Sequence, residues 1–507
     1  MNCECDGNLK ILILVQYKNN PKVSMKSLFL ILSAVLLFFT NCQHQPKQNS
    51  QNQQPNILFL LADDLGYGEL GCYGQEIIKT PVLDELATKG MRFTDFYAGN
   101  AVCSPSRAVL MTGKSSSYNT IRGNNGHFSD DRWMRVALKK DEITLGEMLR
   151  KAGYQTGFVG KWHLDDPNDL STWAFNRGFD YAVQEQWSSR FGGLNFTKNM
   201  EYINGMEDSV FYDDHKWNCK DEFRTNIAFE YLDEIDKDKP FFLFMSYRAP
   251  HAHEPYIHNK ELYADKGWNE KERKHAAKIT LLDKQIGRML RKLQEMGELD
   301  NTLVLFSSDN GPHHEGGHDH EFFNSNRELK GFKRDLYEGG IRVPFIAYWD
   351  GKINEDVVSG HVSGFQDIMP TIAEAAGIDI PEQANGISIL PELTGKNQPK
   401  HEHINWEFQL VGWGRKLPDG GFRQSARINN WKAVRYGLGS GTELYNLEND
   451  IAEMNNVASE HPEIVKKMNQ IFKEERSETE EFPYGGVIQD YKAKDRYIKN
   501  NGTKNLR

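Results

Sequence analysis

Polar side chains follow four short apolar runs, at the points where the runs end. The runs are Asn56–Ala62, Gln155–Gly160, Phe241–Tyr247 and Thr302–Ser307. The polar residues after them include Asp63, Asp64, Lys161, His163, His251, His253, Asp309 and Asn310. A single Asp-Asn-Gly is typical of a turn. Four polar ends are hard to explain as four turns, and in a parallel sheet they would meet at the edge where ligands bind.

Carboxylate and amide oxygens at this edge indicate a site for a hard cation. Three carboxylates and one amide suit Ca²⁺ or Mg²⁺ better than a metal that prefers thiolates. Zinc is the alternative, because a Gly-rich loop supplies further histidines, His313, His314, His318 and His320. Their irregular spacing is not that of a metal-binding helix, so we expect these histidines to be solvated or to face substrate.

One cysteine lies in a specific setting, Cys103-Ser-Pro105-Ser-Arg107. Pro105 suits the first turn of a helix, which would place Cys103 at the helix N-terminus. A buried cysteine near a helix cap is the ordinary interpretation. A thiolate nucleophile favoured by the helix dipole is a second. The five-residue pattern Cys-x-Pro-x-Arg is more specific than either interpretation.

Strand-like and helix-like segments alternate from residue 55 to about residue 390. The apolar runs are continuous, as in strands buried on both faces. Helical patterns separate them: one opens at Pro81, one at the capping box Thr144–Glu147, and a long amphipathic one covers Lys274–Met296. Val343–Trp349 is a further expected strand. The alternation predicts an α/β fold with a large, mostly parallel sheet flanked by helices.

The alternation of expected strands and helices ends near residue 395. Short strand-like segments are broken by Gly and Pro, and they precede one amphipathic helix. The expected strands are Asn405–Phe408, Phe422–Ile428, Trp431–Tyr436 and Glu443–Leu447, and the expected helix is Glu463–Glu474. We therefore expect a catalytic domain at 55–394 and a small antiparallel subdomain at 395–507.

The first 41 residues have the pattern of an export signal. The apolar run at 29–39 is too short to span a bilayer, follows two lysines, and makes Met25 a better start than Met1. The run leads to Cys42 and a polar, Gln-rich tether at 42–54. This pattern resembles a lipoprotein signal cleaved before Cys42, although Asn41 is unusual at the preceding position. Plain secretion is the alternative. Either way we expect an exported protein of the periplasm or cell envelope, touching the membrane only through a lipid anchor.

Composition excludes other classes of function. The 507 residues contain 61 Lys and Arg against 71 Asp and Glu, a net charge of −10. An acidic chain has no global attraction to nucleic acid, so we expect no nucleic-acid partner.

Six cysteines do not make a disulfide scaffold. Apart from the cysteines already discussed and two before Met25, only Cys72 and Cys219 remain, which allows at most one disulfide.

Several motifs together resemble the type I sulfatases of the alkaline-phosphatase superfamily. They are ADDLGYGELGCYG (62–74), CSPSRAVLMTG (103–113), GKWHL (160–164), APHAHEP (249–255), SDNGPH (308–313) and GFKRDLYEGGIRVP (331–344). The resemblance covers nearly all of the mature chain. Lys114 stands where the family usually has Arg. The resemblance implies an alkaline-phosphatase-like fold and a sulfuric ester hydrolase.

The resemblance also implies a modified nucleophile and a metal. Cys103 would be converted to formylglycine (3-oxoalanine) by a formylglycine-generating maturation enzyme. Its hydrate would attack sulfur as an alkoxide stabilised by the metal and Arg107. One Ca²⁺ per chain would be held by Asp63, Asp64, Asp309, Asn310 and the residue made from Cys103.

The remaining site residues would act on the sulfate and the leaving group. By the resemblance, Lys161 and Lys333 would bind the sulfate oxygens. The alternative for Lys333 is an ordinary surface lysine. His251 would protonate the leaving sugar oxygen, and His163 would help to eliminate sulfate from the modified residue. For both histidines a purely structural role is the alternative.

The expected substrate is a sulfated polysaccharide or oligosaccharide, such as a glycosaminoglycan or an algal glycan like ulvan. Two other functions stay open from the sequence. One is a phosphodiesterase or phosphonate hydrolase of the same superfamily. The other is an inactive, lipid-anchored glycan-binding protein, against which the intact Cys103, Arg107 and acidic residues argue.

Overall fold

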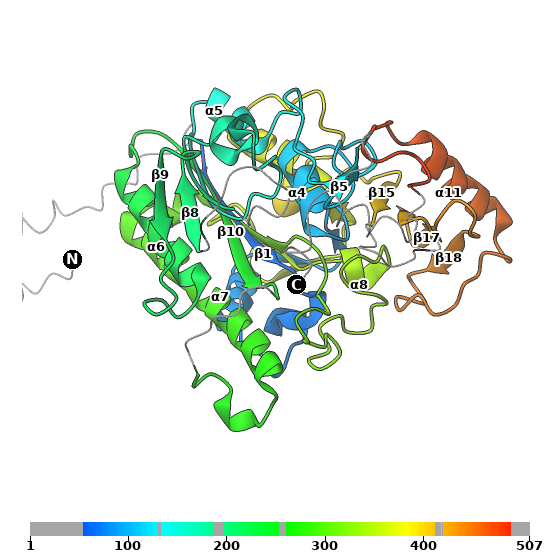
Figure 1. Cartoon of the computed structure of the whole chain (residues 1–507), viewed down its shortest axis with the longest axis horizontal. Coiled ribbons are helices and arrows are strands. Elements are labelled where there is room, and N and C mark those ends of the chain that lie inside the picture. The colour runs from blue at the N-terminus through cyan, green and yellow to red at the C-terminus, as the bar shows by residue number, and fades with distance from the viewer. Residues whose placement is uncertain are drawn as a thin grey trace, which may run out of the picture. The chain divides into compact units, whose positions relative to one another are not determined.

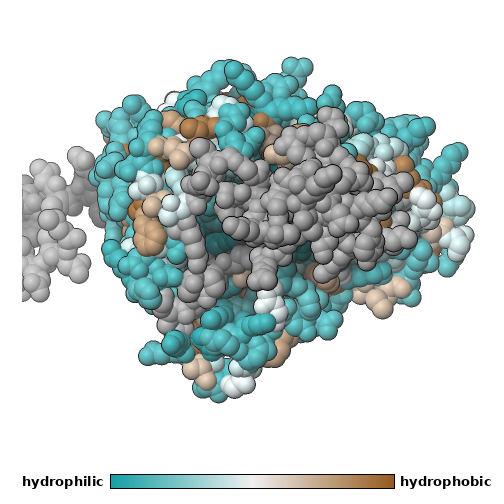
Figure 2. Space-filling view, in the orientation of Figure 1, coloured by the Kyte–Doolittle hydropathy of each residue, from teal (hydrophilic) through white to brown (hydrophobic). Residues whose placement is uncertain are grey.

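The computed structural model describes residues 54–128, 133–186, 197, 199–252, 260–410, 417 and 419–487. The expected signal region, Cys42, nearly all of the tether and His253 lie outside these residues. All described residues belong to one unit, Gln54–Arg507. No described helix has the length and apolar character needed to cross a membrane. Among the coloured residues of the face shown in Figure 2, most are hydrophilic and the hydrophobic ones are scattered.

A ten-stranded mixed sheet forms the centre of this unit. In spatial order its strands are β13 (Val357–Ser359), β2 (Met91–Phe93), β12 (Phe345–Tyr348), β11 (Thr302–Ser308), β1 (Asn56–Asp63), β10 (Phe241–Pro250), β6 (Gln155–Gly160), β7 (Tyr181–Glu185), β8 (Met200–Ile203) and β9 (Asp208–Phe211). The five strands from β11 to β7 are parallel to one another. β12, β8 and β9 pair antiparallel with their neighbours. The predicted, mostly parallel sheet is confirmed, with antiparallel additions near both edges.

The central strands are continuous apolar runs because both of their faces are covered. Every residue of β1 is buried. Ile57, Phe59 and Leu61 lie in the core on one face, and the alternate residues lie in the core on the other. The phenyl rings of Phe59 and Phe244 stack across β1 and β10 with centroids 5.1 Å apart. This double burial fixes the register, since a one-residue slip would exchange the two faces.

Helices cover both faces of the sheet (Figure 1). On one face lie α4 (Cys103–Thr112), α5 (Leu145–Lys151) and α9 (Ile368–Ala376). On the other lie α3 (Pro81–Thr88), α6 (Lys220–Glu234) and α7 (Glu270–Met296). The predicted capping box starts α5. α7 begins earlier than predicted, because the side chain of Asn269 accepts hydrogen bonds from the first-turn amides and caps a charged first turn that lacks apolar periodicity.

The C-terminal segment forms the predicted antiparallel sheet. Its strands are β15 (Ile404–Gln409), β16 (Phe422–Ile428), β17 (Trp431–Tyr436) and β18 (Glu443–Asn446). Helix α11 (Pro462–Glu474) packs on this sheet through Met468, Ile471 and Phe472. Buried Lys432 joins the sheet to the short helix α8 (Glu338–Ile341), with its Nζ 2.7 Å from Glu338. The small sheet is therefore anchored close to the segment that carries Lys333.

The remaining short elements connect these layers. They are β3 (Phe96–Tyr97) paired with β14 (Ser363–Gly364), β4 (Gly126–His127) paired with β5 (Trp133–Met134), and α10 (Leu390–Leu393). The structure forms no disulfide between Cys72 and Cys219.

Candidate active site

Four oxygen-bearing side chains meet where β1 and β11 end. Asp63, Asp64, Asp309 and Asn310 are all completely buried. The chain bends at this point: the register of β1 against β10 shifts between Leu61 and Asp63, and Asp64 adopts a left-handed φ of 69°. The backbone N–H of Asp64 donates to Asp309 Oδ1 at 3.0 Å, and Asn310 Nδ2 donates to Asp64 Oδ1 at 2.8 Å. The strand ends converge as the sequence predicts.

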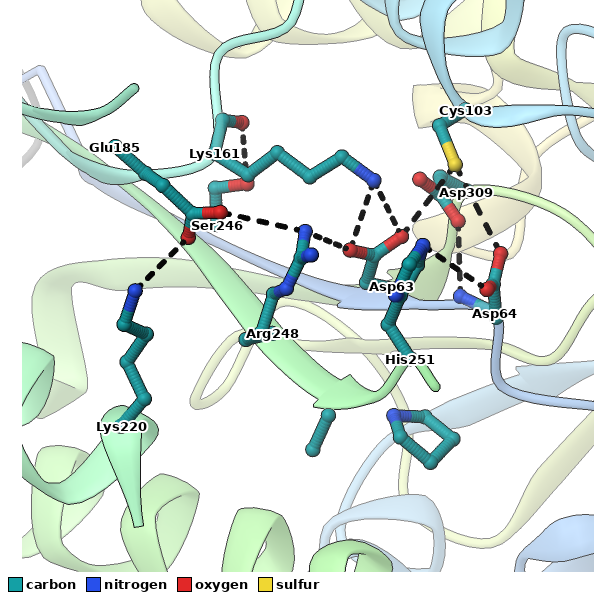
Figure 3. A network of polar contacts seen from close by, with 12 residues as sticks. Asp63, Asp64, Cys103, Lys161, Glu185, Lys220, Ser246, Arg248, His251 and Asp309 are labelled. Atoms are coloured by element: carbon teal, nitrogen blue, oxygen red, sulfur yellow. Dashed lines mark hydrogen bonds and ion pairs between the residues drawn. The ribbon is translucent and has the colours of Figure 1, made fainter. Parts of the chain in front are cut away.

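The N-terminus of α4 brings Cys103 to the same point. Its Sγ lies 3.5 Å from Asp63 Oδ1 and 3.8 Å from Asp64 Oδ1 (Figure 3). Burial, together with the nearby Asp309 carboxylate, raises the pKa of the Cys103 thiol. The unmodified thiol is thus protonated at neutral pH, which argues against a thiolate nucleophile.

Arg107 lies one helical turn after Cys103 and points to the same carboxylates. Its Nε donates to Asp309 Oδ2 at 2.9 Å, and its Nη1 donates to the Lys161 carbonyl at 2.8 Å and to Ser246 Oγ at 2.6 Å. Burial alone would lower its pKa, but Asp309 and Asp63 raise it. Arg107 is therefore a fixed cation that joins α4 to β10 and to the residues that directly follow β6 and β11.

Lys161 and Arg248 both contact Asp63. Lys161 Nζ lies 2.7 Å and 2.8 Å from the two carboxylate oxygens, and Arg248 Nη1 lies 3.2 Å from Oδ2 (Figure 3). Burial favours the neutral acid, yet the pKa of Asp63 is lowered because Lys161, Arg248 and Arg107 favour its anion. Gly160 permits the approach of Lys161: its φ is 122°, and a Cβ there would lie 1.9 Å from the Ser246 carbonyl.

Lys333 contacts the neighbouring carboxylate. Its Nζ lies 2.7 Å from Asp64 Oδ2 and 3.3 Å from Glu315 Oε2, and only 2% of its side chain is exposed. Burial opposes ionisation of Asp64, but Lys333 outweighs it and the pKa of Asp64 falls to about 2. The alternative of an ordinary surface lysine is therefore wrong.

Both candidate histidines border this cluster. His251 is buried with Nε2 3.6 Å from Asp64 Oδ2, and its carbonyl accepts a hydrogen bond from Lys278 Nζ at 2.9 Å. His163 adopts a left-handed φ of 61°, and its carbonyl accepts a hydrogen bond from Ser104 Oγ at 2.9 Å. Burial, followed by nearby cations, lowers the pKa of each imidazole well below its usual value. Within the described residues, the buried Nδ1 of His163 has no hydrogen-bond partner.

The donor set fits a hard divalent cation. Asn310 Oδ1 is buried and has no hydrogen-bond partner within the described residues, beside three carboxylates. Burial raises the pKa of the Asp309 carboxyl to about 6 despite the contact with Arg107. Carboxylate and amide oxygens are ligands typical of Ca²⁺. A bound cation would also let Lys161 and Lys333 turn from the carboxylates to an anionic substrate.

The loop histidines do not supply a zinc site at this edge. His313 and His318 are buried, so of the two expected settings, solvated or facing substrate, the first is wrong for them. His313 Nε2 contacts the Pro250 carbonyl at 3.2 Å, and His318 Nδ1 contacts Glu272 at 2.5 Å. His314 is half-exposed, as predicted. Among the histidines that the structure describes, His251 alone joins Asp63, Asp64 and Cys103 in a group whose ligand atoms lie within 4.8 Å of one another.

Sequence reasoning missed the support behind Asp63. Arg248 lies between Asp63 and Glu185, with Nη1 3.5 Å from Glu185 Oε1, and Lys220 contacts the same Glu185 at 3.5 Å (Figure 3). Arg248 directly follows the apolar part of β10, and this position in the sequence could have indicated that it belongs to the site. Glu185 and Lys220 carry no local motif.

Comparison with known proteins places this α/β fold and its site among the sulfuric ester hydrolases. The Sulfatase family matches residues 55–378, and the family "N-sulphoglucosamine sulphohydrolase, C-terminal" matches residues 329–478. The chain therefore belongs to the sulfatase family.

Relatives cover most of the chain. The N-acetylgalactosamine-6-O-sulfatase of Bacteroides thetaiotaomicron is 29% identical over 86% of this chain and 96% of its own length. The N-acetylgalactosamine-6-sulfatase of Rattus norvegicus is 32% identical over 67% of this chain and 66% of its own. The crystal structure of Ps i-CgsB in complex with k-i-k-neocarrahexaose superimposes with a TM-score of 0.70 at 26% identity, covering 89% of this chain and 98% of that one.

Proposed function

We propose that this chain removes sulfate esters from a sulfated polysaccharide or oligosaccharide, using formylglycine made from Cys103 and one Ca²⁺. The observation that carries this proposal is the placement of Cys103 Sγ within 4 Å of Asp63 and Asp64, which are themselves held by Lys161 and Lys333. The relatives named as N-acetylgalactosamine-6-sulfatases and the neighbour in complex with k-i-k-neocarrahexaose support a sulfated glycan as substrate.

The chemistry follows from the charges around residue 103. Formylglycine would supply a hydrated aldehyde, whose oxygen is a nucleophile toward sulfur. Arg107 would stabilise negative charge on that oxygen, and Lys161 and Lys333 would bind the sulfate oxygens as charge shifts to the leaving group. Ca²⁺ would be held by Asp63, Asp64, Asp309, Asn310 and the modified residue, and would add positive charge at the nucleophile.

Two histidines would move protons. His251 would donate a proton to the leaving sugar oxygen. His163, whose carbonyl accepts a hydrogen bond from Ser104, would accept a proton from the modified residue when sulfate leaves. In the substrate-free site burial, and after it the surrounding cations, lower the pKa of both imidazoles. A bound sulfate would place negative charge beside His251 and favour its protonated form.

The reaction type is tested by comparing esters. Mature enzyme should hydrolyse aryl and glycan sulfates far faster than the matching phosphate mono- and diesters. Cys103→Ala should reduce sulfate release to the background level while retaining the wild-type unfolding transition, because it removes only the nucleophile. Cys72→Ala, which alters a half-buried thiol elsewhere, is the control and should stay active. Faster hydrolysis of the phosphate esters would favour the alternative of a phosphodiesterase or phosphonate hydrolase. Glycan binding without turnover would favour the alternative of an inactive glycan-binding protein.

The metal is tested by removal and return. Chelation should inactivate the enzyme, because three buried carboxylates would then lack their divalent partner, and Ca²⁺ should restore the activity. Asn310→Ala should raise the Ca²⁺ concentration needed for half-maximal recovery, whereas Asn168→Ala, on a surface loop, should not. Restoration by Zn²⁺ but not by Ca²⁺ would contradict the assignment.

The role of His251 is tested by varying the leaving group. His251→Ala should slow the hydrolysis of sugar sulfates by about 10²–10⁴-fold, the usual contribution of a general acid. Activated aryl sulfates should be slowed much less, because their leaving groups need no proton. His461→Ala, in the C-terminal subdomain, should change neither rate. Equal losses on both substrates would exclude His251 as the general acid.

We also propose that the protein is exported to the cell envelope and lipid-anchored at Cys42, with domains as expected from the sequence. The apolar run at 29–39 and the polar tether after it support this assignment. In a bacterial host, labelled fatty acid should enter the wild-type protein and not the Cys42→Ser variant, which should appear in soluble fractions. An unlabelled, membrane-free wild type would favour simple secretion.

A further inference from the structure

Two histidines and an aspartate converge on the loop that follows Asn310. His314 Nδ1 and His320 Nδ1 lie 3.3 Å apart. Asp319 Oδ1 lies 3.5 Å from His314 Nδ1 and 3.8 Å from His320 Nδ1. These three side chains, called the surface triad here, take no part in the catalytic cluster described above.

The spacing is that of ligands around one ion. Zinc holds nitrogen and oxygen ligands at about 2.1 Å in a tetrahedron, which places neighbouring ligand atoms about 3.4 Å apart. All three distances in the surface triad lie close to this value. The carboxylate distances of 3.5 and 3.8 Å are too long for good hydrogen bonds to either imidazole. Asp319 Oδ1 accepts a hydrogen bond from the Glu321 N–H at 3.1 Å, but neither imidazole makes a good hydrogen bond to it.

Contacts outside the triad hold two of its members in place. The backbone N–H of Asp319 donates to Glu272 Oε1 on α7 at 3.0 Å, and the His320 carbonyl accepts from the Ser325 N–H at 2.9 Å. The His320 ring lies against Phe332 with a centroid distance of 4.6 Å. The backbone at Asp319 and the ring of His320 are held in place, so these groups lose little entropy when they bind an ion.

The chemistry of the triad selects the metal. Two imidazole nitrogens and one carboxylate suit Zn²⁺ or Co²⁺, whereas Ca²⁺ requires six to eight oxygens. The side chains of His314 and Asp319 are 51% and 50% exposed, and that of His320 is 14% exposed. Water can therefore complete the coordination. We propose that His314 Nδ1, His320 Nδ1 and Asp319 Oδ1 bind one zinc ion, separate from the Ca²⁺ of the catalytic cluster.

The position of the triad links it to the catalytic loop. Glu315, the neighbour of His314, lies 3.3 Å from Lys333 Nζ and also contacts Arg334. A zinc ion that joins His314 to His320 would close the segment from 314 to 320 into a loop, with Glu315 inside it. The proposed ion would thus restrain Glu315, which contacts the same Lys333 ammonium group as Asp64 does.

Metal titration of the Ca²⁺-saturated, mature protein tests this proposal. Wild type should bind one equivalent of Zn²⁺ by calorimetry, and Co²⁺ in its place should give the visible absorption bands of a tetrahedral site. His314→Ala and His320→Ala should each weaken binding at least tenfold, and Asp319→Asn should weaken it as well. His215→Ala, which removes an exposed histidine elsewhere, should bind as wild type does.

Unchanged thermal unfolding without zinc establishes that the variants are folded. All three substitutions alter exposed or partly exposed side chains, so we expect no loss of fold. Absence of Zn²⁺ binding in wild type would overturn the proposal. Binding that survives in both histidine variants would also overturn it, because the ion would then be held elsewhere.

Discussion

Three carboxylates buried at one point require positive charge around them, and the active site is organised by that requirement. Isolated anions removed from water cost several kcal/mol each, so Asp63, Asp64 and Asp309 stay ionised only with cations in contact. Lys161 and Arg248 form ion pairs with Asp63. Lys333 forms an ion pair with Asp64, and Arg107 forms one with Asp309. Each cation comes from a different element, so the carboxylates join the sheet, α4 and the segment before α8. The same balance prepares the site for a divalent ion and an anionic substrate.

The apolar sequence of the central strands made much of this predictable. A strand buried on both faces is a continuous apolar run, and its polar residues can only come where it ends. Asp63, Lys161, Arg248 and Asp309 are therefore visible in the sequence as the first charged groups after such runs, and His251 follows Arg248 three residues later. The parallel register then brings them together without any further information. The C-terminal strands were predictable for a different reason, since Gly and Pro mark their turns.

Other features depend on contacts that no local pattern records. Glu185 supports Asp63 only through Arg248, and the two acidic residues lie on different strands of the folded sheet. Lys333 lies in a charged segment typical of a surface, yet it is buried because Asp64 requires a cation. His313 and His318 looked like loop histidines and are buried against α7, because Glu272 and a backbone carbonyl offer them partners. The antiparallel direction of β12 likewise follows from chain topology, which its apolar sequence does not encode.

The central claim is that residue 103 acts after conversion and not as a thiol. Mass analysis of the proteolytic peptide that contains residue 103, from fully active protein, tests this claim most directly. The account predicts a peptide in which an aldehyde replaces the thiol group, in a fraction that rises with specific activity. A fully active preparation whose Cys103 is unmodified and can be alkylated after unfolding would contradict it.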